Sequence, residues 1–343
     1  MLVSFLVPVY NVEKYIDQCM KTLLMQTGCD YEIVLLDDGS KDSSGVICDQ
    51  YAAKYPDLVR VVHKQNEGLF MTRRRGFKEA KGDYLVCVDS DDYIKPNYLE
   101  TIVKYIQEYD CDMLMFDYES FYPDGHTELS GIDLKNIFVY ENEQKQNIYK
   151  KRLLENKYNN IWSKVIRRDI MDFETDYSVY GIKNMCEDAI QSYELYTRAK
   201  KIVFIPEVLY CYRRNIASIT ANVNMDYWYA LRTSYELGWK YMDLWKVNDE
   251  VRQRYASRCI SYYVDFIHWL LVRSNKAEID QIVNETMLEN KYFNESVRLY
   301  KKEYLATKYL RFRNPIIIHM IMHKSYKSIK RFYQLETKIR KGK

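Results

Sequence analysis

The first 110 residues alternate short apolar runs with amphipathic stretches, and this alternation constrains the fold more than any other feature of the chain. Continuous apolar runs at residues 3–7, 33–36 and 84–88 are typical of strands that are buried on both faces of a sheet. Apolar residues at helical spacing between these runs predict helices of moderate length. Strands that alternate with such helices form βαβ units, so we predict an α/β fold with a mostly parallel sheet flanked by helices.

The alternation weakens after residue 116 and then gives way to helices. Residues 117–140 are expected to be extended chain or loop, and from about residue 224 the segments are helical and dense in Tyr and Trp. We therefore divide the chain into an α/β domain at 1–220, with halves at 1–115 and 116–220, and a helical region at 221–343. The expected helices lie at about 12–26, 43–55, 69–80, 97–108, 143–155, 185–199, 226–245, 248–273 and 276–292, and the further strands at 59–62, 113–116, 161–166, 202–205 and 208–213.

The formal net charge of +3 hides a strong asymmetry along the chain. Residues 301–343 hold 13 Lys and Arg against 2 Asp and Glu and so carry +11, whereas the first 300 residues carry −8. Basic side chains interleaved with bulky apolar ones, as at 309–333, are typical of an interfacial helix on anionic lipid. A helix that packs on the rest of the protein is the alternative, and the acidic body disfavours nucleic acid as a partner.

The sequence favours a cytoplasmic protein. No stretch approaches 18 consecutive apolar residues, so we expect no membrane-spanning helix. The first eleven residues lack the charged start and the small-residue cleavage site of a signal peptide. The eight cysteines are scattered without a C-x-x-C pair, which indicates reduced thiols rather than disulfides or a zinc site.

Polar clusters follow the strands of the predicted sheet, where ligands bind in folds of this class. Asp89-Ser90-Asp91-Asp92 comes directly after the strand at 84–88. Three carboxylates within four residues repel one another unless a cation neutralises them. Mg²⁺ and Mn²⁺ take oxygen ligands of this kind together with substrate phosphates, so we expect a metal-bound diphosphate here. An acidic turn with a helix cap is the alternative.

Two further clusters accompany the acidic one. Asp37-Asp38 ends the second strand and can accept hydrogen bonds from a nucleotide base, or can form a turn with the residues that follow. Asn66-x-Gly68 leads into a helix that carries Arg73, and the free N–H groups of a helix start together with an arginine favour phosphate. The chain lacks a G-x-G-x-x-G and a P-loop motif, which excludes dinucleotide and P-loop nucleotide sites of those kinds.

Short motifs occur in a fixed order along the first 220 residues. They are Pro8-Val9-Tyr10-Asn11, Asp37-Asp38-Gly39-Ser40, Asn66-x-Gly68 with Arg73, Asp89-Ser90-Asp91-Asp92, Trp162-x-Lys164, Glu187-Asp188, Leu209-Tyr210-x-Tyr212-Arg213 and Ser218-Ile219-Thr220. In this order and spacing they closely resemble glycosyltransferase family 2, whose members have the GT-A fold, a Rossmann-like sheet flanked by helices. The match is strong over 1–115 and weaker to 220, and a helical C-terminal extension is a habit of bacterial members.

One departure from the family pattern concerns three adjacent arginines. Many members have Arg-Asn where this chain has Arg73-Arg74, which leaves the phosphate or base contact at this position open. Three adjacent arginines cannot share one helical face, so at least one of them is expected to be a solvated surface charge.

The resemblance implies a donor site for a nucleotide-diphosphate sugar, most simply a UDP-sugar. Pro8, Tyr10 and Asp38 hold the nucleotide base, with Tyr10 close to the ring. Asp89 contacts the ribose, and Asp91 ligates a Mn²⁺ or Mg²⁺ ion. The resemblance completes the donor-binding residues with Asn11, Asp37, Asn66, Gly68, Arg73, Ser90 and Asp92.

Glu187-Asp188 resembles the family's Glu-Asp pair at the acceptor site. Direct displacement at the anomeric carbon needs a base for the acceptor hydroxyl, and the resemblance gives this role to Asp188 with Glu187 as its partner. Two ordinary acids in the first turn of a helix are the alternative. The resemblance implies an inverting, metal-dependent glycosyltransferase acting on a glycan or polyprenyl-lipid-linked acceptor in capsule, exopolysaccharide or other cell-surface glycan synthesis. Together with the basic tail, it places the protein on the inner face of a bacterial plasma membrane.

Two other classes of function stay open at this point. A nucleotidyltransferase would share the sheet and the metal but would release pyrophosphate, and its usual glycine-rich first loop is absent. An inactive nucleotide-sugar-binding module would bind the donor without turnover, which the intact acidic motifs disfavour.

Overall fold

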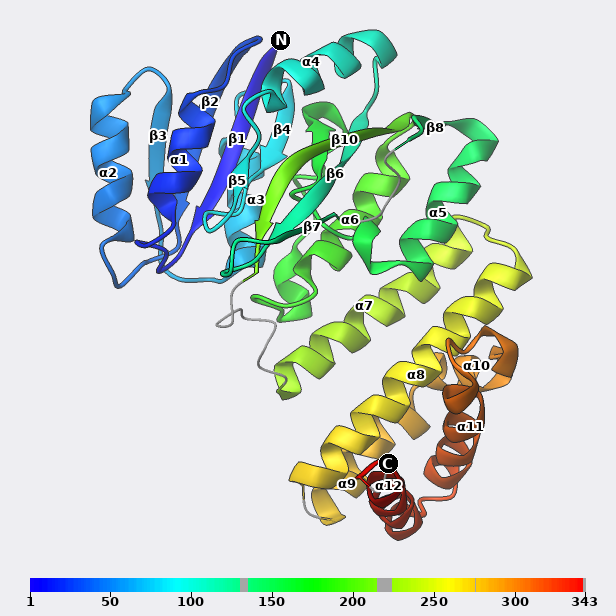
Figure 1. Cartoon of the computed structure of the whole chain (residues 1–343). Coiled ribbons are helices and arrows are strands. Elements are labelled where there is room, and N and C mark those ends of the chain that lie inside the picture. Colours follow the sequence, from blue (N-terminus) through cyan, green and yellow to red (C-terminus); the bar gives the residue numbers. More distant parts are fainter. Residues whose placement is uncertain (130–134, 215–223, 275, 342–343) are drawn as a thin grey trace. The chain divides into compact units, whose positions relative to one another are not determined.

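The computed structural model describes residues 1–129, 135–214, 224–274 and 276–341 (Figure 1). The chain forms two compact units, Met1–Ser234 and Tyr235–Lys343. The expected domain boundary at residue 220 and the motif Ser218-Ile219-Thr220 lie outside the described residues.

The N-terminal unit is built on one mixed sheet. Its strands are β1 Leu2–Val9, β2 Asp30–Asp37, β3 Val59–His63, β4 Tyr84–Cys87, β5 Tyr93–Ile94, β6 Met113–Phe121, β7 Thr127–Leu129, β8 Phe138–Tyr140, β9 Lys164–Arg167 and β10 Ile202–Arg213. The order is β3-β2-β1-β4-β9-β6-β10-β5, with β7 beside β6 and β8 beside β10. β3, β2, β1 and β4 pair in parallel, whereas β9 runs antiparallel to both β4 and β6. The α/β class is confirmed: four neighbouring strands are parallel in the first half of the sheet, and β6 and β10 form a further parallel pair in the second half.

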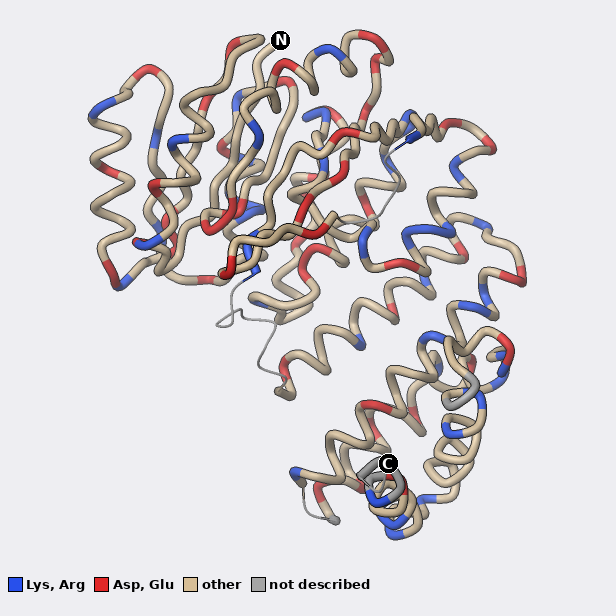
Figure 2. The backbone as a smooth tube through the Cα atoms, viewed as in Figure 1, with Lys and Arg blue, Asp and Glu red and all other residues tan. Residues whose placement is uncertain are grey.

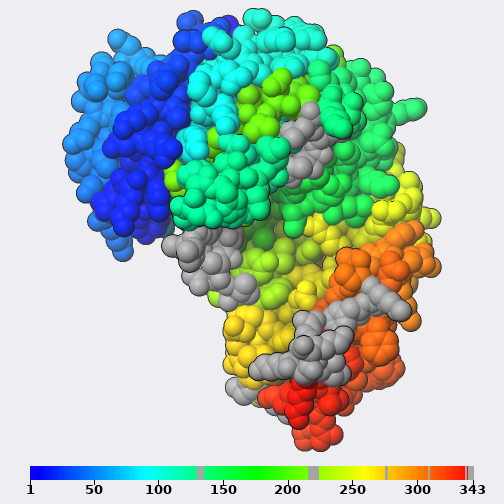
Figure 3. Space-filling model, in the orientation of Figure 1, coloured from blue at the N-terminus to red at the C-terminus, as the bar shows by residue number. Residues whose placement is uncertain are grey.

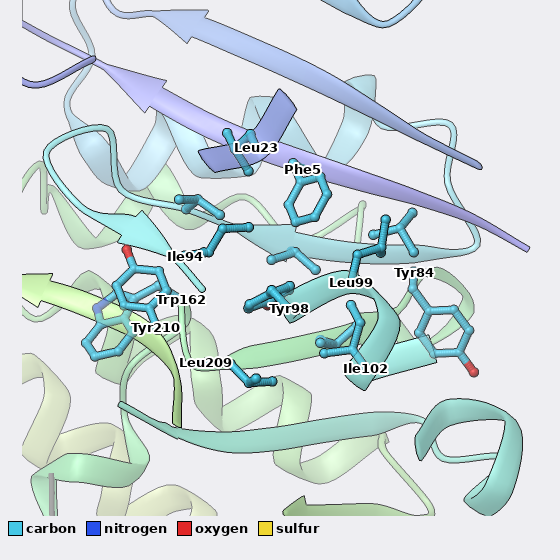
Figure 4. Close-up of a cluster of buried hydrophobic side chains, with 14 of the residues drawn as sticks. Phe5, Leu23, Tyr84, Ile94, Tyr98, Leu99, Ile102, Trp162, Leu209 and Tyr210 are labelled. Carbon is cyan, nitrogen blue, oxygen red and sulfur yellow. The ribbon is translucent and has the colours of Figure 1, made fainter. Parts of the chain in front are cut away.

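Helices cover both faces of this sheet. They are α1 Ile16–Leu24, α2 Ser44–Lys54, α3 Leu69–Glu79, α4 Tyr98–Tyr109, α5 Lys145–Leu154 and α6 Glu187–Arg198. Strand side chains alternate between the two faces of the sheet. On one face, Phe5 of β1 packs beside Leu23 of α1 and Tyr98 of α4, and the centres of the Phe5 and Tyr98 rings are 5.9 Å apart (Figure 4). On the opposite face α3 approaches β2 closely, since a Cβ at Gly76 would lie only 2.8 Å from Leu36.

The parallel strands bring the predicted motifs to one edge of the sheet. β1 and β2 are in register, with Val9 opposite Asp37, and β4 pairs with the other side of β1. Each of these strands ends where a polar motif begins. The turn after β1, the Asp37-Asp38 pair and the loop after β4 therefore lie on the same side of the sheet.

The second half of this unit confirms one expectation and corrects another. The described residues within 117–140, expected to be extended chain or loop, include the end of β6 at Phe121 and the strands β7 and β8. The two strands expected at 202–205 and 208–213 are one strand, β10, whose pairing with β6 shifts register between Phe204 and Tyr210. Irregular pairing of this kind weakens the local alternation on which the sequence prediction depends.

The C-terminal unit is helical. Its helices are the end of α7 (Met225–Leu244), α8 Asp249–Arg273, α9 Lys276–Val283, α10 Lys291–Leu299, α11 Lys308–Met322 and α12 Tyr326–Lys341. Aromatic side chains fill its core, with the Tyr263 ring 4.8 Å from that of Phe293 and Trp239 5.9 Å from Tyr255. The single helix expected at 276–292 is broken, because Asn290 accepts hydrogen bonds from the backbone of Tyr292 and caps α10.

The basic tail forms α11 and α12, which pack on α8 within this unit. Ile321, Ile329 and Tyr333 are buried, and the Tyr333 hydroxyl donates to the backbone carbonyl of Val264 (3.0 Å). Lysines and arginines line these last helices, which form part of the unit's surface (Figures 2 and 3). Among the described residues, no helix is long and apolar enough to cross a membrane.

Candidate functional site

The acidic loop after β4 is held in place by β10. The buried carboxylate of Asp92 accepts hydrogen bonds from the Tyr210 hydroxyl (2.8 Å) and from the backbone N–H of Arg213 (2.7 Å). Burial and the neighbouring carboxylates raise the pKa of Asp92, although its two hydrogen bonds oppose the rise. The Tyr210 hydroxyl also accepts from the backbone N–H of Asp89 (3.1 Å), so one tyrosine fixes both ends of the acidic motif.

Aromatic rings pack together next to this loop. Trp162 stacks on Tyr210 with ring centres 4.5 Å apart, and on Tyr212 at 5.5 Å. The Tyr118 ring meets Trp162 edge-on at 4.7 Å. The Trp162-x-Lys164 and Tyr210-x-Tyr212 motifs, which are far apart in sequence, therefore build one rigid platform for the Asp89–Asp92 loop.

Arg73 joins the acidic loop to the Glu187-Asp188 pair. Its guanidinium is buried, with one nitrogen 2.7 Å from an Asp89 oxygen. The other terminal nitrogen donates to Glu187 (3.2 Å) and to Asp188. Three carboxylates from two motifs about 100 residues apart thus meet at one arginine of α3. The structure brings these four predicted site residues together.

Solvent reaches two of the three carboxylates of this cluster, whereas Arg73 and Glu187 are buried. The side chains of Asp89 and Asp188 are 21% and 20% exposed, whereas that of Arg73 is 1% exposed. Burial raises the pKa of Glu187 and of Asp188, and the Arg73 charge opposes the rise in both. A substrate can therefore reach Asp89 and Asp188, while the buried Arg73 guanidinium compensates part of their negative charge.

Lys164, which sequence reasoning named only as part of a motif, is fully buried in the same unit. Its amine donates to the backbone carbonyls of Tyr158 (3.1 Å) and Asn160. Burial lowers the pKa of Lys164 to about 7, although the charge of Asp188 opposes this. The sequence signal for this buried lysine was its place within the mostly apolar run Asn-Ile-Trp-Ser-Lys-Val-Ile. A charged side chain is rarely buried without a partner, so a lysine in such a run indicates a specific contact.

Asp37 and Asp38 point to different partners. Asp38 is buried and accepts hydrogen bonds from the backbone N–H groups of Glu67 and Gly68 (both 2.9 Å), so it shapes the loop that leads into α3. Asp37 accepts from the backbone N–H of Ser40 (3.0 Å) and lies 2.8 Å from His63 Nδ1. The two adjacent acids therefore fix two different connections of the sheet.

The start of α3 differs from the sequence expectation. The backbone N–H groups of Leu69 and Phe70, expected to be free, donate to the Asn184 side chain and the Lys183 carbonyl (both 2.9 Å). Gly68 has φ +89°, and a Cβ there would lie 2.7 Å from Lys183, so only glycine allows this close approach. Asn66 donates to the backbone carbonyl of Asp38 (3.0 Å) and supports the same turn.

The turn after β1 carries the remaining predicted donor residues. Pro8 is buried within β1, whereas the Tyr10 side chain is exposed. Asn11 adopts a left-handed backbone conformation (φ +54°), and its side chain accepts from the backbone N–H of Lys41 (2.8 Å). Asn11 thus links this turn to the one that follows Asp38, and Tyr10 lies beside it with its ring accessible.

The arginines next to Arg73 have other partners. Arg74 is buried, donates to the backbone carbonyl of Asp172 and lies over the Tyr177 ring (4.6 Å). Arg75 is exposed and pairs with Glu79 on the same helix. Arg74, which stands where many family members have Asn, therefore contacts the 172–177 segment. Arg75 is the surface charge that the sequence predicted.

The acidic loop offers a limited set of metal ligands. Among the described residues, no three His, Cys, Asp or Glu side chains are grouped so as to hold a metal ion by themselves. Asp89 is bonded to Arg73 and Asp92 to β10, while Asp91 is partly exposed. Mg²⁺ commonly binds through one or two carboxylates together with substrate phosphates, and the residues present fit that pattern.

Known proteins are similar to this chain in sequence. A family model described as Glycosyl transferase family 2 matches residues 4–172. Glycosyltransferase GlyG of Streptococcus pneumoniae is 34% identical over 247 residues, which cover 69% of this chain and 75% of that protein. The putative glycosyltransferase EpsH of Bacillus subtilis is 32% identical over 220 residues, which cover 63% of this chain and 62% of that protein.

The fold also has counterparts among solved structures. A crystal structure of S. aureus TarS 1–349 in complex with UDP-GlcNAc matches with a TM-score of 0.65 at 18% identity, over 98% of this chain and 92% of that chain. The likeness confirms the GT-A fold, a mixed sheet flanked by helices, and the helical C-terminal region. Because GlyG is more than 30% identical over three quarters of its own length, the chain belongs to glycosyltransferase family 2.

Proposed function

We propose that this family 2 enzyme is an inverting glycosyltransferase that moves a sugar from a UDP-sugar to a glycan or polyprenyl-lipid-linked acceptor. The observation that carries the proposal is the meeting of Asp89, Glu187 and Asp188 at Arg73. This contact puts a carboxylate of the predicted donor motif next to the predicted acceptor pair. Direct displacement requires this proximity, because donor and acceptor react in one step.

Asp188 is the proposed base. Its carboxylate is partly exposed, so an acceptor hydroxyl can reach it, and it is held by Arg73. Burial raises its pKa and so makes it a stronger base than a solvated aspartate. Asp188 takes the proton of the acceptor hydroxyl while the oxygen attacks the anomeric carbon from the face opposite the leaving diphosphate, which inverts the configuration.

The donor is proposed to lie across the edge formed by the turns after β1, β2 and β4. Tyr10 has an accessible ring for the base, and Asp38 and Pro8 shape the turns beside it. The complex of TarS with UDP-GlcNAc supports a UDP-sugar as the donor. Asp91 would hold a Mn²⁺ or Mg²⁺ ion, which when bound stabilises the negative charge of the departing diphosphate.

The exposed basic face of α12 favours a membrane surface as the place of action. Lys327, Lys330 and Arg331 are exposed, while the apolar face of the same helix is buried in its own unit. Membrane binding would therefore rest on charge, at about 1 kcal/mol for each Lys or Arg near an anionic surface. A peripheral enzyme on the inner face of the plasma membrane would meet a lipid-linked acceptor in capsule, exopolysaccharide or other cell-surface glycan synthesis.

The proposal is tested by incubating the full chain with UDP-GlcNAc, UDP-glucose and UDP-galactose in Mn²⁺ or Mg²⁺ and measuring released UDP. We expect slow hydrolysis of at least one donor, loss of turnover with EDTA, and loss of at least about tenfold in Asp91→Asn. Asp83→Asn, which changes an exposed aspartate just before β4, is the matched control and should keep full turnover.

Other results of the same assay separate the rival functions. Pyrophosphate release from UTP with a sugar phosphate would favour a nucleotidyltransferase. Calorimetric binding of UDP without any turnover would favour an inactive binding module. Full activity of Asp91→Asn in EDTA would contradict metal-dependent transfer.

A further inference from the structure

His63, the last residue of β3, has no role in the reaction described so far. Its ring nitrogen Nδ1 lies 2.8 Å from a carboxylate oxygen of Asp37, and its Nε2 lies 3.0 Å from one of Asp49 on α2. His63 and Asp37 are paired across β3 and β2, so their side chains lie on the same face of the sheet. A neutral histidine has a single ring N–H, and only the protonated ring can donate to both carboxylates. The contact with two acids therefore favours the charged ring.

The surroundings of the His63 ring come from its own strand and from β2 and α2. The first turn of α2 packs against it, since a Cβ at Gly45 would lie 3.8 Å from His63 Cε1. The hydrogen bonds to Asp49 and Asp37 raise the pKa of His63 above its ordinary value of 6.5, although burial and the positive end of α2 oppose the rise. The titratable groups in and around this contact are Asp37, Asp42, Cys48, Asp49 and Lys64, whose amine is bonded to Asp38.

Hydrogen bonds connect Asp37 to the turn that carries Tyr10. The Asp37 carboxylate accepts from the backbone N–H of Ser40 (3.0 Å). The Ser40 hydroxyl accepts from the backbone N–H of Asn11 (3.2 Å). Consecutive hydrogen bonds through Asp37 and Ser40 thus connect the His63 ring to the residue next to Tyr10.

We propose that protonated His63 is a positioning residue for the nucleotide base of the donor and acts through Asp37 and Ser40 on the Tyr10 turn. The proposal rests on the proposed function, since it takes Tyr10 as the residue that faces the base. Deprotonation leaves one N–H for two carboxylates, so the bond to Asp37 is lost or loses its charge assistance. The donor therefore binds more tightly below the pKa of His63 than above it.

The test measures by calorimetry, with Mg²⁺ present, the affinity of the full chain for the UDP-sugar that it turns over fastest. The diphosphate of a UDP-sugar is fully ionised between about pH 6 and pH 9, so a change in affinity over this range reports on the protein. For the wild-type chain we expect Kd to rise about three- to tenfold with pH, the effect of one hydrogen bond. The kcat at saturating donor should differ less than about twofold between wild type and the His63 variants, because proton transfer at Asp188 is a separate step.

Two substitutions of His63 separate its charge from its size. His63→Gln, which cannot be charged, should bind the donor at every pH as weakly as the wild type does at high pH. His63→Lys, which stays charged throughout the range, should bind with little dependence on pH and more tightly than His63→Gln.

Asp49→Asn distinguishes positioning from a simple effect of charge. Asp49 is 65% exposed, and its removal makes the surface more positive, so attraction alone would tighten the binding of an anionic donor. Positioning predicts weaker binding near neutral pH, because His63 loses a partner that favours its charged form. The decline in affinity should then begin at lower pH. Tighter binding with the decline in its wild-type place would overturn the proposal.

His126→Gln is the matched control. His126 also lies between two carboxylates, 2.5 Å from Asp124 and 4.0 Å from Glu128, on the hairpin between β6 and β7. Its side chain is half-exposed, like that of His63. We expect the affinity for the donor and its pH dependence to stay as in the wild type. Thermal unfolding of all variants shows which of them are folded under the assay conditions.

The positioning role and the proposed function can fail separately. Wild-type affinity and pH dependence in His63→Gln would overturn the positioning role and leave an enzyme that binds a UDP-sugar. Failure of both His63 variants to fold, with His126→Gln folded, would make His63 a structural residue and would also overturn it. Failure of the wild-type chain to bind any UDP-sugar would contradict the proposed function, and the role of His63 with it.

Discussion

The two units treat charged side chains in opposite ways. In the N-terminal unit Arg73, Asp92, Lys164 and Glu187 are all buried, and all of them except Lys164 are predicted site residues. Among the described residues of the C-terminal unit, Arg313 is the one charged side chain that is buried, and its partner Asp265 is 56% exposed. The core of that unit is aromatic, and the lysines whose exposure the structure describes lie on its surface.

This difference indicates that the charged side chains buried in the N-terminal unit serve the reaction rather than the stability of the fold. Burying a charge is unfavourable by several kcal/mol unless partners compensate, and apolar residues of similar size often stabilise a core as well or better. A fold that needed only stability could use the aromatic packing of the C-terminal unit throughout. The buried charges around Arg73 are therefore best explained by the reaction, and their perturbed pKa values agree with that.

The largest effect is expected when Arg73, the cation at the centre of the buried charges, is replaced. Arg73→Met leaves Asp89, Glu187 and Asp188 without their common cation, and we expect a loss of about 3–5 kcal/mol in the free energy of unfolding at pH 7. The loss should shrink as the pH falls toward 5, because protonated carboxyl groups no longer need the cation. Urea unfolding at several pH values measures both effects, and UDP release from UDP-sugars should be abolished.

Arg313→Met is the matched variant in the C-terminal unit. Asp265 keeps its contact with water when Arg313 is removed, so we expect a smaller loss of about 1–2 kcal/mol, and unchanged UDP release. Equal losses in the two variants would contradict the distinction between the units.

A smaller effect, on membrane binding, is expected when exposed charges of the C-terminal unit are removed. Replacing Lys327, Lys330 and Arg331 of α12 with Gln should weaken binding to vesicles that contain anionic lipid by about 3 kcal/mol, roughly a hundredfold. Stability should change little, because these side chains are exposed. Vesicle flotation measures the binding, and full turnover of soluble donor is expected.

The control for α12 is an equal change of charge in the other unit. Lys21, Lys54 and Lys78 are exposed on α1, α2 and α3 and can be replaced with Gln together. If both triple variants float equally well, the basic face of α12 has no special role at the membrane.

Local patterns predicted the elements of the first half well. β1, β2, β4 and α3 follow from apolar runs and helical spacing, because each signal lies within one element. The break between α9 and α10 was missed, although Asn290 is a typical cap residue, since a continuing apolar period outweighed it.

The sequence predicted which residues belong to the site, but it did not predict which of them contact one another. No local signal shows that Arg73 pairs with Glu187 and Asp188, because this pairing depends on α3 and α6 lying on the same face of the sheet. Asp37 and Asp38 look alike in sequence, yet the loops around them give each a different partner. Contacts between distant segments are set by topology, which a single sequence specifies only through the whole fold.

The most direct test of the central claim is the turnover of Asp188→Asn at saturating donor with a glycan acceptor, together with calorimetric binding of UDP. The amide keeps the size of the side chain and removes its basicity. We predict unchanged affinity for UDP and a loss of kcat of about 100-fold or more. Unchanged turnover would contradict the account, because Asp188 could then not be the base beside Arg73.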